Sequence, residues 1–189
     1  MGLQGKVKVN DLRYEQATEE IVRERLYLVE VASFPEDEAA SLEGMLERAA
    51  VTGPLFIVAY DASGKWESDN NKPLGFVNCT FTNATELSHH AMDEALVEGT
   101  TVVIQSVTVA EQYRRQGLAG AMLRHWLEEA RGALVGPDKT TRVTLALLIC
   151  KEHLISFYAS CGFTYKRVSP IVHGKDTWHE MSYDWSECA

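Results

Sequence analysis

Apolar and polar positions along this chain alternate with two periods, one typical of strands and the other of amphipathic helices. Short apolar runs bounded by Gly, Pro, Asn and Asp predict strands. Longer stretches with a recurring apolar stripe predict helices. The expected strands cover residues 6–14, 55–60, 74–81, 102–109, 142–150, 165–168 and 177–183, and the expected helices cover residues 19–31, 37–50, 118–127 and 154–160, with a helical turn at 90–97.

This order of elements predicts one α/β domain over residues 1–189, built on a mixed sheet of about six or seven strands with about four helices. A buried strand, a helix and a second buried strand follow each other between residues 102 and 150, which is typical of a parallel pair joined by a crossover helix. The strands at 55–60 and 74–81 are expected to form a hairpin with a longer loop. No internal repeat or low-complexity linker divides the chain.

The stretch from Thr100 to Leu127 combines the strongest of these signals with candidate chemistry. Val102 to Val109 is mostly β-branched and apolar, Arg114 to Gly120 is a basic loop with glycines, and an amphipathic helix follows. The first amides of a helix have no intrahelical partners and carry partial positive charge. The small residues of the loop would let an anion approach the main chain, and its two arginines would add charge.

An ordinary basic turn between a strand and a helix would have the same composition. The loop lacks the Gly-Lys-Ser/Thr ending of a Walker A loop and the G-x-G-x-x-G spacing of a Rossmann fingerprint. Taken alone, the loop leaves anion binding and a plain turn open.

Two motifs together resemble the GNAT superfamily of N-acetyltransferases. Residues 114–119 (R-R-Q-G-L-A) match the pattern Arg/Gln-x-x-Gly-x-Gly/Ala of that family's pyrophosphate loop, and residues 157–163 end a short helix with F-Y-x-x-x-G-F. In this order and spacing the two motifs are far more specific than either one alone. The resemblance implies the GNAT fold, in which the sheet is splayed between its fourth and fifth strands.

The same resemblance implies acetyl-CoA as the cosubstrate. Its pantetheine arm would pair with the main chain of the central strand like an added strand, and its diphosphate would lie on amides of the basic loop. The strand at residues 147–150 would form a wall of the acetyl pocket. The cofactor-binding residues expected on this basis are Val107, Thr108, Val109, Arg114, Arg115, Gln116, Gly117, Leu118, Ala119 and Gly120.

Acetyl transfer to an amine needs a neutral amine, a stabilised oxyanion and a proton for the leaving thiolate. An alkylamine with a pKa of about 10 is mostly protonated at pH 7, and removing its proton costs roughly 4 kcal/mol. Tyr158 matches the family's usual general acid for the CoA thiolate and is the expected catalytic residue. The alternative is a half-buried structural aromatic on a short helix.

Within the superfamily, residues 150–158 (C-K-E-H-L-I-S-F-Y) and 171–181 (I-V-H-G-K-D-T-W-H-E-M) resemble the arylalkylamine (serotonin) N-acetyltransferases. That subfamily implies contacts of Trp178 and Phe34 with the arylalkyl group of the substrate, although both could equally be core aromatics. Its vertebrate members carry a His-x-His pair on the central strand, where this chain has Val103 and Gln105. The chain is therefore more similar to the non-vertebrate members.

Without that histidine pair, the resemblance does not assign the general base. The candidates beside the expected amine pocket are Glu36, Asp37 and Glu38, or His173 and His179, and each could also be an ordinary surface or strand residue. The three acidic residues could instead attract a cationic amine through their field.

Composition narrows the choice of partners and compartment. The net charge of −9 argues against a general nucleic-acid footprint. No apolar run is long enough to span a bilayer, and no signal-peptide pattern opens the chain, so we expect a cytoplasmic protein with no membrane partner. The four cysteines lack C-x-x-C spacing, so no metal site is expected.

The leading hypothesis is an acetyl-CoA-dependent N-acetyltransferase acting on small primary amines, arylalkylamines first and polyamines second. Acetylation of a protein or peptide amine is the alternative within the same class, and it needs an open groove. A non-catalytic acyl-CoA-binding sensor is the alternative from a different class. The missing histidine pair favours the sensor, whereas Tyr158 counts against it.

Overall fold

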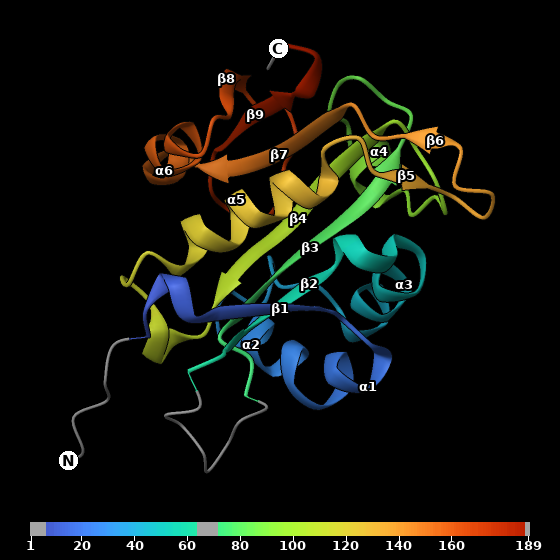
Figure 1. Cartoon of the computed structure of the whole chain (residues 1–189). Coiled ribbons are helices and arrows are strands. Elements are labelled where there is room, and N and C mark those ends of the chain that lie inside the picture. The colour runs from blue at the N-terminus through green and yellow to red at the C-terminus, as the bar shows by residue number, and fades with distance from the viewer. Residues whose placement is uncertain (1–6, 64–71, 188–189) are drawn as a thin grey trace.

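The computed structural model of the chain describes residues 7–63 and 72–187, and it centres on a seven-stranded mixed sheet (Figure 1). In spatial order the strands are β1 (Leu12–Gln16), β2 (Ile57–Asp61), β3 (Gly75–Thr82), β4 (Thr101–Val109), β7 (Leu145–Lys151), β9 (Trp178–Asp184) and β8 (Thr164–Val168). Neighbouring strands are antiparallel except β4 and β7, which are parallel. The predicted mixed α/β sheet with a central parallel pair is confirmed.

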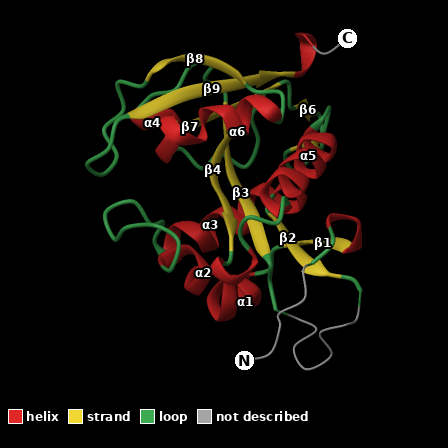
Figure 2. Cartoon of the chain, turned by 90° about the vertical axis from the view of Figure 1, so that its left-hand side faces the viewer, coloured by secondary structure: helices red, strands yellow, loops and turns green. Residues whose placement is uncertain are grey.

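Helices cover both faces of this sheet (Figure 2). They are α1 (Glu19–Ile21), α2 (Tyr27–Val31), α3 (Leu42–Thr52), α4 (His89–Asp93), α5 (Leu118–Ala130) and α6 (Ile155–Ser160). The helices α5 and α6 pack into the main core on one face, and α1 to α4 pack on the other. Trp126 of α5 is fully buried, and its indole Nε1 donates to the Leu55 carbonyl at 2.7 Å, which fixes α5 against the sheet.

Hydrogen bonds at the helix starts explain where two of the helices begin. The Thr18 hydroxyl accepts from the Ile21 amide at 3.3 Å, which confirms the helical start expected at residue 19. This helix continues through a π-helical turn, Val22–Leu26, into α2. The helix predicted at residues 37–50 instead begins at Leu42, because the Ser41 hydroxyl accepts from the amide three residues later at 3.1 Å.

Two strand predictions are wrong in their bounds. The first strand was expected at residues 6–14 but begins at Leu12, after a 3₁₀ turn, and Lys6 lies outside the described residues. The apolar Val7 contributed to the alternation of apolar and polar residues that predicted a strand here. Val7 is buried, yet its amide donates to the Gln116 side chain and not to a neighbouring strand. The strand predicted at 142–150 is divided, because Thr141–Arg142 (β6) pairs with Leu134–Val135 (β5) in a small separate hairpin.

An extra residue interrupts the ladder between β3 and β4. Cys79 lies opposite Ile104, whereas Asn78 lies opposite Ser106, so Gln105 has no partner residue on β3. This is a β-bulge, which bends a strand and reverses the face of the side chains beyond it.

The side chains of β4 change face at this bulge. Ile104, Val107 and Val109 all belong to the core under α5, although the first two are three positions apart and would lie on opposite faces of a regular strand. Ser106 and Thr108 therefore turn to the opposite face, where their hydroxyls meet a carboxylate of α2.

The parallel pairing of β4 with β7 also ends next to the bulge. The two strands are paired only from Thr101 opposite Leu145 to Val103 opposite Leu147. Beyond this point they diverge, which is the splay predicted between the fourth and fifth strands of the sheet.

Candidate active site

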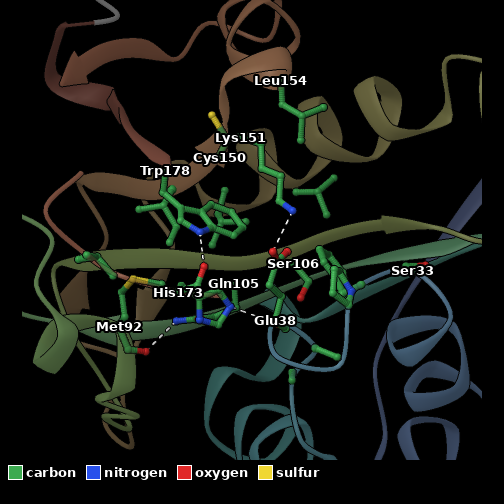
Figure 3. Close-up of a pocket in the computed structure, with 18 of the residues that line it drawn as sticks. Ser33, Glu38, Met92, Gln105, Ser106, Cys150, Lys151, Leu154, His173 and Trp178 are labelled. Atoms are coloured by element: carbon green, nitrogen blue, oxygen red, sulfur yellow. Dashed lines mark hydrogen bonds and ion pairs between the residues drawn. The ribbon is translucent and has the colours of Figure 1, made fainter. Parts of the chain in front are cut away.

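A cavity of about 390 Å³ lies where β4 and β7 diverge (Figure 3). Its walls come from the two strands, from α2 and the segment after it, from α3, α4 and α6, and from the loop between β8 and β9. Tyr158, Trp178 and Phe34 all line this cavity, although they are distant in the sequence. The structure thus brings together the predicted catalytic residue and both predicted substrate contacts.

Tyr158 lies on α6 and is only 7% exposed. Its ring makes edge-on contacts with Phe157 and Phe163. Burial raises the pKa of the Tyr158 phenol, so the phenol keeps its proton at neutral and moderately alkaline pH. A protonated phenol in this cavity has the form that a general acid requires.

Cys150 lines the same cavity at the end of β7. Burial raises the pKa of its thiol to about 11, so the thiol is protonated at neutral pH. The thiolate is the nucleophilic form of cysteine. A protonated thiol is a weak nucleophile, so Cys150 lacks the form that a covalent acyl-cysteine would require.

Trp178 is buried and held in one orientation. Its indole Nε1 donates to the carbonyl of His173 at 2.5 Å, and the Lys151 Nζ lies 5.5 Å from the ring centroid. Phe34, on the segment after α2, is half-buried at the same cavity. Both aromatic rings can contact an apolar ligand here, and the substrate contact stays a prediction.

Glu30 is a residue of this site that sequence reasoning missed. It lies at the end of α2, is 1% exposed and lines the cavity. Its carboxylate accepts from the Ala40 amide at 3.1 Å, from the Ser106 hydroxyl at 3.1 Å and from the Thr108 hydroxyl at 3.5 Å. An acidic residue near the end of an amphipathic helix is expected to be a surface charge. The two hydroxyl partners of Glu30 reach it only because the side chains of β4 change face at the bulge.

Burial raises the pKa of Glu30 above its usual value of 4.5, and the hydrogen bonds and the charge of Arg48 oppose this only in part. Between 4.5 and the raised pKa, the folded chain holds a proton that the unfolded chain has lost, so the free energy of unfolding falls as pH rises through this window. Glu30→Gln removes this titration. We therefore expect the stability of the variant relative to the parent to increase with pH, measured by urea unfolding at several pH values.

The exposed Glu24→Gln is the matched control for that measurement, and its stability relative to the parent should show no such trend. A stability difference between Glu30→Gln and the parent that does not change with pH would contradict the raised pKa.

The edge of β4 beyond the bulge offers main-chain groups to a ligand. The Ala110 amide donates to the Leu74 carbonyl, and hydrogen-bonded pairs alternate along an antiparallel ladder. The main chain of Val107 and Val109 therefore faces away from β3, toward the side from which β7 has diverged. The Val109 carbonyl already accepts from the Arg114 Nε at 2.9 Å, which leaves Val107 as the more available residue.

The loop before α5 has the backbone of an anion cradle. Gly117 precedes the helix with φ of 83°, and Arg115 has φ of 62°, so both are left-handed. The N-cap residue Gly117 has no side chain to cap α5, and among the described residues the first amides of this helix are available to an anion. The two other polar side chains of the motif are hydrogen-bonded within the protein. Arg114 also donates to the Ser33 hydroxyl at 2.8 Å, and the side-chain oxygen of Gln116 accepts from the Val7 amide.

The candidate bases lie in three different places. Glu38 and His173 line the cavity, whereas Glu36 and Asp37 are exposed beside it and are not among the residues that line it. His179 lines a different hollow, beside Asp176 and Thr177.

The two positions of the absent histidine pair have other roles. Val103 packs in an apolar cluster with Leu147 and Ile171. The Gln105 amide Nε2 donates to the Thr80 hydroxyl at 3.0 Å and to the Met92 carbonyl at 2.9 Å, which ties α4 to the bulge.

Within residues 7–63 and 72–187, no group of three or more His, Cys, Asp or Glu side chains is arranged to hold a metal ion. Among these same residues, none of the helices is both long enough and apolar enough to cross a bilayer.

Residues 17–163 match the acetyltransferase (GNAT) family. The chain belongs to this family. It is thus a GNAT N-acetyltransferase, a class of enzyme that takes the acetyl group from acetyl-CoA. No curated protein sequence is similar enough to this chain to count as a match.

Solved structures of GNAT proteins share the fold at low sequence identity. The loading GNATL domain of CurA from Lyngbya majuscula is 12% identical, with a TM-score of 0.73 over 93% of this chain and 98% of that one. NAA60 from Arabidopsis thaliana in complex with acetyl-CoA is 19% identical, with a TM-score of 0.66 over 92% and 98%. The ribosomal-protein-S18-alanine N-acetyltransferase from Escherichia coli is 17% identical, with a TM-score of 0.58 over 92% and 93%. These likenesses concern the fold and do not identify the acceptor or the arylalkylamine subfamily.

Proposed function

We propose that this GNAT enzyme acetylates a small primary amine that binds in the cavity between β4 and β7, an arylalkylamine first and a polyamine second. One observation carries the choice of a small acceptor. At the cavity, the segment after α2 contacts both the loop between β8 and β9 and the end of β7. The His173 Nε2 of the loop lies 3.1 Å from the Glu38 carbonyl, and Lys151 of β7 pairs with the Glu38 carboxylate at 2.9 Å. These contacts narrow the access that a folded protein acceptor would need.

The cosubstrate fits the described residues. Acetyl-CoA supplies an activated thioester when bound. The main chain of Val107 would hold the pantetheine arm, and the uncapped amides from Gly117 to Gly120 would hold the diphosphate, with the exposed Arg115 adding charge. Because Arg114 and Gln116 have internal partners, we assign these two side chains to shaping the loop.

In the proposed reaction the ammonium group of the acceptor first loses a proton to solvent, and the neutral nitrogen attacks the thioester carbonyl carbon. The C–N bond forms, the C–S bond breaks, and the second nitrogen proton also passes to solvent, from which the Tyr158 phenol is later reprotonated. Tyr158 donates its phenolic proton to the departing thiolate. Trp178 and Phe34 would hold the apolar body of the amine, which favours an arylalkylamine. A polyamine has no aromatic body, and its additional ammonium groups would instead pair with the carboxylates of the cavity.

Two other functions are weighed against this one. An N-terminal amine of a protein is the second candidate, favoured by the structural likeness to an enzyme that acetylates ribosomal protein S18 and to a NatC complex bound to a peptide. A non-catalytic acyl-CoA sensor is the third, and the protonated Tyr158 in the cavity counts against it.

An acceptor panel tests the proposal directly. Purified protein is mixed with acetyl-CoA and with tryptamine, phenylethylamine, spermidine or a short peptide, and free thiol is measured over time. We expect thiol release with at least one small amine and little with the peptide. Release only with the peptide would favour the protein acceptor, and no release with any acceptor would favour the sensor.

A further inference from the structure

One carboxylate oxygen in the cavity is buried without a partner. Glu38 is 8% exposed, and its Oε1 accepts from the Lys151 Nζ at 2.9 Å. Its Oε2 is buried and has no hydrogen-bond partner among the described residues. Buried polar atoms are nearly always hydrogen-bonded, and leaving a charged one unpaired is costly, so this atom points to a missing donor.

The carboxylate is held firmly in place. Lys151 is fixed in turn by Asp176, whose Oδ2 lies 2.6 Å from the lysine Nζ, and His173 contacts the main-chain carbonyl of Glu38. Gly174 packs so closely that an added Cβ would lie 2.8 Å from the Glu38 Cγ, and its φ of 66° is one that a side chain rarely adopts. Figure 3 shows this arrangement, with Glu38, Lys151, His173 and Trp178 around the same space. The loop between β8 and β9 thus positions the free oxygen.

The charges around the cavity favour a cationic ligand. Its lining includes three carboxylates, of Glu30, Glu38 and Asp93, and two permanent cations, of Arg48 and Lys151. Both cations face carboxylates: Lys151 pairs with Glu38 and Asp176, and the charge of Arg48 acts on Glu30. A further ammonium group would balance the remaining negative charge and supply the missing donor.

We propose that the Glu38 Oε2 is the recognition site for the protonated amino group of the acceptor, which makes this enzyme selective for cationic primary alkylamines. This inference rests on the proposed function. Glu38 binds and orients the amine before its proton is lost, while the apolar body of the acceptor lies against Trp178, whose ring is beside the Lys151–Glu38 pair. The recognition extends to any amine with such a body, aromatic or polymethylene.

Glu38→Gln tests this assignment, because it keeps the size of the side chain and an acceptor for Lys151 but removes the charge. We expect the KM for phenylethylamine to rise about 10-fold to 100-fold, with kcat and the KM for acetyl-CoA nearly unchanged. Asp37→Asn is the matched control, since it removes an exposed carboxylate beside the cavity, and it should leave all three constants unchanged. A fall in kcat at constant KM would contradict a role in recognition.

A neutral ligand provides a second measure of the same interaction. The parent should bind phenylethylamine better than 2-phenylethanol, measured as competitive inhibition of spermidine acetylation, and Glu38→Gln should lose most of that preference. Equal preference in the variant and the parent would overturn the proposal and would mean that solvent satisfies the free oxygen.

Binding separates this inference from the proposed function. Phenylethylamine and spermidine are titrated calorimetrically into the parent and into Glu38→Gln, each saturated with CoA, and unchanged CoA affinity shows that the variant is folded. Amine binding that depends on Glu38 without any acetylation would leave the inference standing and reject the proposed function. Absent binding in the parent, or equal binding in the variant, would overturn the inference whatever the activity.

Discussion

Replacing Tyr158 by phenylalanine is expected to lower kcat about 100-fold or more, because a general acid typically contributes that much to a proton transfer. The thiolate of CoA would then have to leave without a donor. The phenyl ring keeps the contacts with Phe157 and Phe163, so the fold and the affinity for CoA should change little. The measurement is steady-state thiol release together with calorimetric titration of CoA.

Tyr165→Phe is the matched control for this experiment. It removes a phenolic hydroxyl that lies 3.5 Å from the His179 Nδ1 and outside the residues that line the cavity, so kcat should be unchanged. A Tyr158→Phe enzyme as fast as the parent would remove the acid role and leave Tyr158 as a packing residue.

Replacing Gly117 by aspartate is expected to lower the affinity for CoA about 1000-fold. Two like charges about 4 Å apart repel by about 4 kcal/mol near a protein surface, and about 1.4 kcal/mol corresponds to a tenfold change in affinity. The new carboxylate would compete with the diphosphate for the uncapped amides of α5. Calorimetric titration of CoA measures the effect.

Gly117→Asn separates charge from backbone strain in this test. Asparagine has nearly the same size as aspartate and tolerates the left-handed φ of 83° at this position, but it carries no charge. Its affinity for CoA should therefore fall far less. An equal loss in both variants would show that bulk or strain decides, and normal binding by Gly117→Asp would move the diphosphate away from this loop.

Local signals were sufficient for most of the interactions that lie within a few residues of the chain. The cap at Thr18, the strand that became β4 and the start of α5 after Gly117 all follow from side-chain type and from apolar periodicity. The predicted start of α3 was wrong. The acidic residues from 36 to 38 resemble a first helical turn, whereas the helix is capped by Ser41 and begins at Leu42.

The candidate site was predicted only in part. Tyr158, Trp178 and Phe34 were singled out by resemblance, and the structure places them at one cavity. Glu30 could not be found in this way, since one of its hydrogen-bond partners, the hydroxyl of Ser106, lies 76 positions further along the chain. The free oxygen of Glu38 could not be predicted locally either. It depends on Lys151, which is distant in the sequence and donates to one carboxylate oxygen and not to the other.

The sequence by itself determined the order of the seven strands of the main sheet, the glycine-bearing loop before α5 and membership of the GNAT family, because each of these depends on short-range pattern or on contiguous motifs. Only the tertiary structure decided which charged side chains become part of the site. For Glu30 that outcome depends on one additional residue, Gln105, in β4. The bulge lies where the two parallel strands part and turns Ser106 and Thr108 toward Glu30, and no local propensity encodes a change of face produced by pairing between distant strands.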